Sequence, residues 1–241
     1  SVPPWMSPCT NGRGFILIRF DMTVITKEKM LLEERSALYG AVSALFADPE
    51  SQKFELLLKP EIQGLVLDTC FQLESTLCGT DAGLSKPFQQ IMAKLSANNL
   101  KKIQSEFVDV FGHTLSKQIA PYALEHLKNT DVFFRTQKLA DLNGFYKAFG
   151  MEVESIERAD HISTQTEFLS FLLLKERLAE RDGLIEEMGV CQDAFDQFQK
   201  DHFLDWAKMF AENLSTQVDG KFYPKAGKFL CSLIEFEKGE K

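Results

Sequence analysis

The sequence predicts an all-α protein of about nine or ten helices, and three observations support this fold class. Apolar residues recur at spacings of three and four along most of the 241 residues, as they do on the buried face of a helix. No segment alternates apolar and polar residues over the length of a strand, apart from a short stretch at 15–19. The 21 phenylalanines, against four tyrosines and two tryptophans, indicate a core packed mainly by phenylalanine.

Start and stop signals in the sequence define the expected helices. Thr26 and Asp131 are residues that commonly cap a first turn, and either Asn98 or Asn99 is expected to do the same. Pro87 lies at a helix start, where its missing N–H costs little. The clearest helices are expected at 27–47, 61–77, 87–95, 100–111, 132–149, 162–180, 191–214 and 220–236.

Residues 1–21 differ in composition from the rest of the chain. Three prolines and an Asn-Gly pair interrupt any regular element in this stretch. Met22, which follows it, resembles a natural start of translation. We therefore expect 1–21 to be an atypical N-terminal extension.

The charge balance limits the classes of partner. The chain has 35 acidic and 27 basic residues, for a formal net charge of −8 at pH 7. A nucleic-acid binder usually has the opposite balance, because lysine and arginine are needed to neutralise phosphates. An acidic surface instead favours basic partners, including arginine-bearing peptides. We therefore expect no nucleic-acid partner.

Cysteines, histidines and apolar runs exclude further classes. The five cysteines form no C-x-x-C pair, which indicates reduced thiols in a cytoplasm. The four histidines lack the spacing of zinc ligands, so no metal site is predicted. The longest apolar run, at 15–18, is too short for a signal sequence or for stable membrane insertion. The phosphate-loop, nucleophile-elbow and dinucleotide motifs are lacking, so neither an enzyme nor a bound cofactor is predicted.

The stretch 157–174 opens with an adjacent acid and histidine before a long helical pattern. Asp160 is expected to cap this helix by accepting a bond from a free backbone N–H, and its charge suits the positive helix end. If Asp160 only caps the helix, Asp160→Asn should keep nearly all of the protein's stability, since asparagine caps equally well. Asp160 and His161 are not expected to form an acid–base pair, because adjacent helix residues do not face each other.

Three groups of motifs follow one another: Phe107-Val-Asp-Val-Phe-Gly112 with Ala-Pro-Tyr122; Tyr146-x-x-x-Gly150 with Glu157-x-x-Asp160-His161-Ile162 and Glu167-Phe168-Leu169; and His202-Phe-Leu-x-Trp206 with Phe210 and Phe222-Tyr223. In order and spacing they resemble the TorD/DmsD/NarJ family of cytoplasmic chaperones for molybdopterin oxidoreductases. The resemblance covers about 33–236. The chain departs from the family at Arg158 or Ala159, where a proline is usual, and at Phe107, where a tyrosine is usual.

The resemblance implies a fold and a function. Family members are single helical units of two lobes, which here implies an N-terminal lobe at 22–150, a hinge at 151–161 and a C-terminal lobe at 162–241. Some members form homodimers by domain swapping across this hinge. They bind the twin-arginine signal peptide of a molybdoenzyme's catalytic subunit, delay its export and assist cofactor insertion. Such a peptide needs acids for its arginines and an apolar groove for its helix-prone stretch.

Together, the resemblance and the residue chemistry predict a peptide-binding site. Its expected members are Asp160, His161, Tyr39, Pro121, Tyr122 and Glu157. Asp160 would pair with a leader arginine and Glu157 would add a diffuse attraction, whereas a structural turn is an equally good role for Pro121. His202 and Trp206, four apart on a helix, are expected in the core. Two other functions stay open: a general helical scaffold protein, and a weak GTP-binding factor for cofactor loading.

Overall fold

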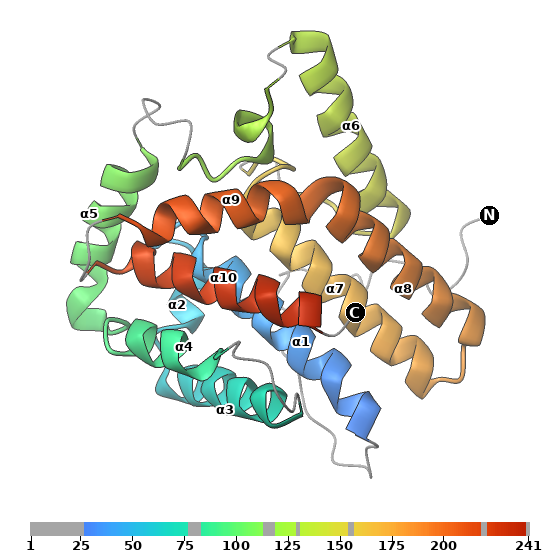
Figure 1. Cartoon of the computed structure of the whole chain (residues 1–241), viewed down its shortest axis with the longest axis horizontal. Helices are drawn as coiled ribbons and strands as arrows, with labels where there is room; N and C mark the ends of the chain where they lie inside the picture. The colour runs from blue at the N-terminus through green and yellow to red at the C-terminus, as the bar shows by residue number, and fades with distance from the viewer. Residues whose placement is uncertain are drawn as a thin grey trace.

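The all-α prediction is confirmed by a computed structural model, which describes residues 27–76, 83–112, 119–128, 131–153, 157–217 and 221–239 (Figure 1). The α-helices in these ranges are α1 Lys27–Leu45, α2 Gln52–Leu56, α3 Pro60–Thr76, α4 Ser85–Met92, α5 Leu100–Phe111, α6 Val132–Ala148, α7 Ile162–Arg181, α8 Ile185–Phe198, α9 Leu204–Ser215 and α10 Tyr223–Gly239. Shorter elements are the 3-10 helices η2 Ala97–Asn99 and η3 Ala123–His126, and the π-helical turn η4 Gln199–Phe203.

Helices α1 and α7 pack along each other in the middle of the molecule (Figure 1). Helix α7 also packs on α8, α10 packs on both α9 and α4, and α3 lies against α1. The buried apolar side chains form one cluster, to which all the helices from α1 to α10 contribute. The division into lobes at 22–150 and 162–241 stays a prediction, and the paired helices α1 and α7 belong to opposite sides of it.

Phenylalanine rings join the elements that surround residue 160. Phe168 of α7 lies between two neighbours, with ring centroids 4.7 Å from Tyr146 of α6 and 4.9 Å from Phe198 of α8. All three rings are buried. Because aromatic pairs of this geometry add to the energy of apolar burial, they hold the C-terminal part of α6 beside the first turns of α7.

The helix expected at 191–214 begins earlier and is interrupted. It starts at Ile185, two residues after Gly183, which has a φ of +72° in the turn that follows α7. Glu186 and Glu187 in its first turn suit the positive end of a helix dipole. The π-helical turn η4 then separates α8 from α9, a change of winding that apolar spacing did not reveal.

The short helix α2 was not predicted from the sequence. Ser51 caps it by accepting a hydrogen bond from Phe54 N at 3.2 Å, and the Phe54 side chain is completely buried. The helix has five residues, which are too few to show a helical period in the sequence. Its position is therefore set by the cap and by one buried ring.

The predicted caps differ in outcome. Asp131 caps α6 as predicted, because its Oδ1 accepts a hydrogen bond from Phe134 N at 2.9 Å. Asn99 occupies the cap position of α5, but its side-chain amide donates to Lys94 O at 3.1 Å, so the predicted side-chain cap is wrong. Outside the described residues lie the expected cap Thr26, the stretch 15–19 and the extension 1–21.

Helix α10 lies against α9 at Gly227. A Cβ atom there would be 3.0 Å from both Ala211 O and Ser215 N. Gly227→Ala is expected to lower the free energy of unfolding by about 1 kcal/mol, because the two helices must move apart. Gly64→Ala on α3 is the matched control, since no heavy atom lies within 4 Å of its Cβ position. The control should gain about 0.5–1 kcal/mol from helix propensity, and equal changes in urea unfolding would contradict the close packing.

Candidate functional site

Two segments meet beside the N-terminus of α7, a loop that leads into η3 and a turn that leads into α7. Tyr122 on the first and His161 on the second form an antiparallel bridge. Ala123 N donates a hydrogen bond to Asp160 O at 2.9 Å across the same two segments. Because backbone hydrogen bonds join them, Asp160 and His161 are held against the loop that carries Tyr122.

The side chain of Asp160 is completely buried, and both of its oxygens accept hydrogen bonds. Its Oδ2 accepts a hydrogen bond from Leu124 N at 3.0 Å. Arg158 binds the same carboxylate with two hydrogen bonds, from Nε to Oδ1 and from Nη2 to Oδ2, each 2.9 Å long. A buried carboxylate needs such partners, since an unpaired charge in a protein interior is strongly unfavourable. Asp160 therefore joins η3 to the segment before α7.

The prediction that Asp160 caps α7 is wrong, because His161 is the N-cap. His161 Nδ1 accepts a hydrogen bond from Ser163 N at 3.2 Å. The backbone at His161 is extended, with φ −71° and ψ 143°, and adjacent side chains on an extended backbone point to opposite sides. Asp160 consequently bonds to Leu124 and not to the first turn of α7.

His161 is neutral at pH 7. Burial, together with the nearby charges of Lys53 and Arg158, lowers its pKa to about 3. The neutral ring can therefore accept the hydrogen bond from Ser163 N. Glu157 Oε2 lies 3.7 Å from His161 Nδ1, but a neutral imidazole forms no ion pair with it.

The guanidinium of Arg158 lies on the solvent side of the site. Its Cζ atom is 4.3 Å from the centre of the Tyr122 ring, within the range of a cation–π contact. Its Nη1 lies 3.6 Å from Glu125 Oε1. The Arg158 side chain is 42% exposed, whereas that of Asp160 is 0% exposed. The site is thus a buried carboxylate covered by a partly exposed guanidinium, with a ring and a second carboxylate beside it.

The structure brings together five of the six residues predicted for the site, namely Asp160, His161, Pro121, Tyr122 and Glu157. Pro121 is buried, and its carbonyl accepts a hydrogen bond from Ile162 N at 2.8 Å, so it has a structural role in the loop. Glu157 lies at the rim and is partly exposed. Burial raises its pKa.

Tyr39 lies apart from these residues, within the core. Its side chain is completely buried, and Gln199 Nε2 donates a hydrogen bond to its hydroxyl at 2.6 Å. A peptide at the surface does not reach this ring, which corrects the expectation that Tyr39 lines a groove. Trp206 is buried as predicted, and its Nε1 donates to Gln165 Oε1 at 2.9 Å.

Three contributors to the site were missed from the sequence. Arg158 covers Asp160, Leu124 acts through its backbone N–H, and Tyr146 of α6 donates its hydroxyl to Ala159 O at 2.6 Å. Arg158 could have been found, because it lies two residues from Asp160 and its long basic side chain can reach that carboxylate within one turn, which His161 N closes by donating to Arg158 O at 3.1 Å. A backbone donor such as Leu124 N leaves no signal in the sequence.

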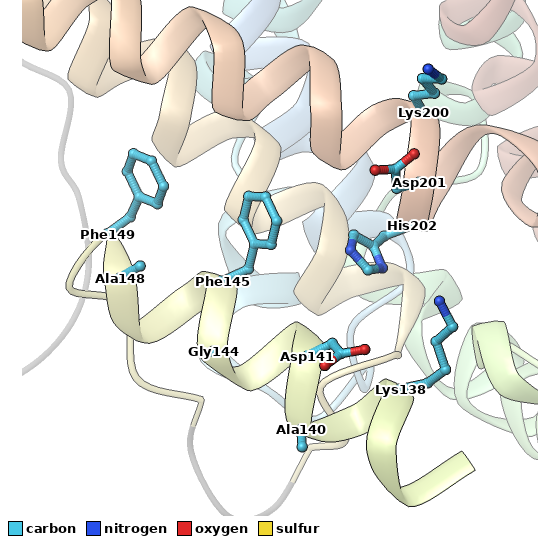
Figure 2. Close-up of a pocket in the computed structure, with 10 residues that line it drawn as sticks. All are labelled: Lys138, Ala140, Asp141, Gly144, Phe145, Ala148, Phe149, Lys200, Asp201 and His202. Atoms are coloured by element: carbon cyan, nitrogen blue, oxygen red, sulfur yellow. The ribbon is translucent and has the colours of Figure 1, made fainter. Parts of the chain in front are cut away.

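A cleft of about 900 Å³ lies between α6 and the π-helical turn η4 (Figure 2). Phe145 of α6 and His202 of η4 both line it and contact each other edge to face, with ring centroids 5.6 Å apart. Burial lowers the pKa of His202, and the charge of Lys138 adds to this effect. The other lining residues are Ala140, Asp141, Gly144, Ala148, Phe149, Lys200 and Asp201. This cleft was not predicted from the sequence.

Within the described ranges, no group of three or more histidine, cysteine or carboxylate side chains is placed to hold a metal ion. No helix in the same ranges is long and apolar enough to cross a membrane. Cys70, Cys191 and Cys231 are free, and burial raises the pKa of Cys70 to about 12 and of the other two to about 11. These thiols therefore stay protonated at neutral pH.

Residues 79–212, more than half of the chain, match the family model described as nitrate reductase delta subunit. The chain is 25% identical over 211 residues to the chaperone protein TorD of Vibrio vulnificus strain YJ016, covering 85% of this chain and 93% of that protein. It is 23% identical to the chaperone protein TorD of Vibrio parahaemolyticus, in a match that covers 87% of this chain and 95% of that protein. The chlorate reductase assembly chaperone protein of Ideonella dechloratans is 32% identical over 99 residues, in a match that covers 40% of this chain and 49% of that protein.

Proposed function

The chain belongs to the nitrate reductase delta subunit family, the TorD/NarJ family, and from this premise we propose that it is a chaperone for the catalytic subunit of a molybdopterin oxidoreductase. It binds the twin-arginine signal peptide of that subunit in the cytoplasm and holds it until the cofactor is inserted. It acts by binding and not by catalysis. The relatives support a chaperone role, since two are named as chaperones and one as an assembly chaperone.

The observation that carries the proposal is the arrangement around Asp160. A guanidinium already lies there, bonded to a buried carboxylate and placed against an aromatic ring. A carboxylate fork and a ring face are the groups by which proteins recognise arginine. Tyr122, Glu125 and Glu157 lie around this point with partly exposed side chains, where they would attract a second arginine.

We assign the apolar stretch of the signal peptide to the cleft between α6 and η4. Phe145 and Phe149 give this cleft apolar side chains. The same helix α6 donates the Tyr146 hydroxyl to Ala159 O, so the C-terminal part of α6 borders both the cleft and the Asp160 segment. One peptide would then contact both surfaces.

Domain swapping across the hinge 151–161 stays part of the proposal. Helices α1 and α7 come from opposite sides of the hinge and pack along each other. In a swapped homodimer, α1 of one chain would pack on α7 of its partner, and the core would keep its contacts. The dimer would therefore preserve the fold described above.

Titration calorimetry with a synthetic twin-arginine signal peptide tests the function. The peptide is expected to bind at least about tenfold more tightly than its Lys-Lys counterpart, because lysine cannot make the bidentate contact. Its affinity should fall as salt is added, because ions screen the attraction to an acidic surface. Binding of neither peptide, or equal binding of both at every salt concentration, would contradict the proposal.

A matched pair of variants locates the binding in the same experiment. Glu157→Gln removes an acid at the rim of the site, and Glu186→Gln removes an exposed acid at the start of α8. Both change the net charge equally. Only Glu157→Gln should weaken binding of the twin-arginine peptide. Equal losses of affinity in both variants would indicate a general charge effect.

A further inference from the structure

The free chain has its own arginine on the carboxylate that a partner arginine would use. Arg158 makes two hydrogen bonds of 2.9 Å to Asp160, and its Cζ atom lies 4.3 Å from the Tyr122 ring. These contacts use both oxygens of the carboxylate and one face of the ring. A peptide arginine cannot make the same contacts while Arg158 is in place.

The two members of this ion pair differ in their access to water. Asp160 is 0% exposed, so its carboxylate requires a partner at all times. Arg158 is 42% exposed, and its long side chain can turn into solvent, where the charge is hydrated. Replacement of one guanidinium by another therefore keeps Asp160 paired while it frees Arg158.

We propose that Arg158 is an internal occupant of an arginine-recognition site and that a partner arginine binds by displacing it. The inference rests on the proposed function for the identity of the partner, a twin-arginine peptide. The apparent affinity of the peptide is then lower than its affinity for the open site, because it binds only the fraction of molecules in which Arg158 does not cover Asp160. Lysine peptides are rejected, because an ammonium group does not replace the two hydrogen bonds that are lost.

Chemical complementation tests the site without any peptide. Arg158→Ala leaves Asp160 without its guanidinium, and millimolar methylguanidinium is expected to raise the melting temperature of this variant in a saturable way. Methylammonium should have no such effect, because it lacks the planar fork. The wild-type protein should respond to neither cation, since its site is filled. Arg181→Ala, which removes an exposed pair with Asp182, is the matched control and should also respond to neither.

Calorimetry with the twin-arginine peptide then tests displacement. Arg158→Ala is expected to bind it about tenfold more tightly than the wild type, because the competing state is removed. Arg158→Lys keeps the charge without the fork and should show a smaller gain, which provides a second variant if the first does not fold. Absence of the methylguanidinium effect, or unchanged or weaker peptide binding in both variants, overturns the inference. Saturable complementation with no peptide binding by any form supports the arginine site and contradicts the proposed function instead.

Discussion

Asp160→Ala is expected to lower the free energy of unfolding by about 3–5 kcal/mol, because it removes one half of an ion pair whose carboxylate is buried. The change also leaves Leu124 N without its acceptor. Asp160→Asn should cost about 2 kcal/mol, since the amide keeps one acceptor but turns its NH₂ toward another donor. Urea unfolding followed by circular dichroism measures both changes.

Asp131 provides the matched control, because it is a helix cap of the kind first expected of Asp160. Asp131→Ala should cost about 1 kcal/mol and Asp131→Asn close to nothing, since asparagine caps as well as aspartate. The two positions should therefore differ most in their asparagine variants. A silent Asp160→Asn would show that the contacts to Leu124 and Arg158 contribute little to stability.

Acidification is expected to destabilise the protein through His161. The native state keeps this buried ring neutral down to its pKa of about 3, whereas the unfolded chain protonates it near 6.5. The unfolded state thus binds the additional proton, and stability that is complete above pH 6.5 is lost as the pH falls toward 3. At pH 5 the loss is about 2 kcal/mol, from a difference of about 1.5 pH units.

Two carboxyl groups act in the opposite direction, so the His161 effect must be measured as a difference. Burial raises the pKa of Glu34 and of Glu176 to about 7, and these groups stabilise the native state as the pH falls from 7 toward 4.5. His161→Asn keeps a capping side chain but cannot protonate. Between about pH 8 and pH 5, its stability relative to the wild type should rise by about 2 kcal/mol. Parallel pH profiles would contradict the assignment.

Most helices were predictable because their signals are local. Helix α5 was expected at 100–111 and is Leu100–Phe111, and α6 begins directly after its predicted cap, Asp131. Where the controlling contact is not periodic, the prediction failed. Helix α2 depends on Ser51 and one buried ring, and the turn η4 changes the winding inside an otherwise regular helix.

The site was predictable in its residues but not in its contacts. The partner Leu124 N lies 36 residues from Asp160, so their hydrogen bond depends on how η3 packs beside α7. The capping preference of aspartate favoured Asp160, but the extended backbone at the helix start gives that position to His161. Tyr39 has a polar hydroxyl that suits a groove, and its bond to the buried Gln199 depends on the packing of α1 against η4.

Displacement of Arg158 is tested most directly by its side-chain Nε–H resonance in protein made with isotope-labelled arginine. Comparison with Arg158→Lys assigns the resonance, and Arg35, bound by two hydrogen bonds to Glu237, is an internal reference. When unlabelled twin-arginine peptide is added, we expect the Arg158 resonance to shift and its proton to exchange faster with water, while that of Arg35 stays unchanged. A peptide that binds while the Arg158 resonance keeps its position and exchange rate would contradict the proposed displacement.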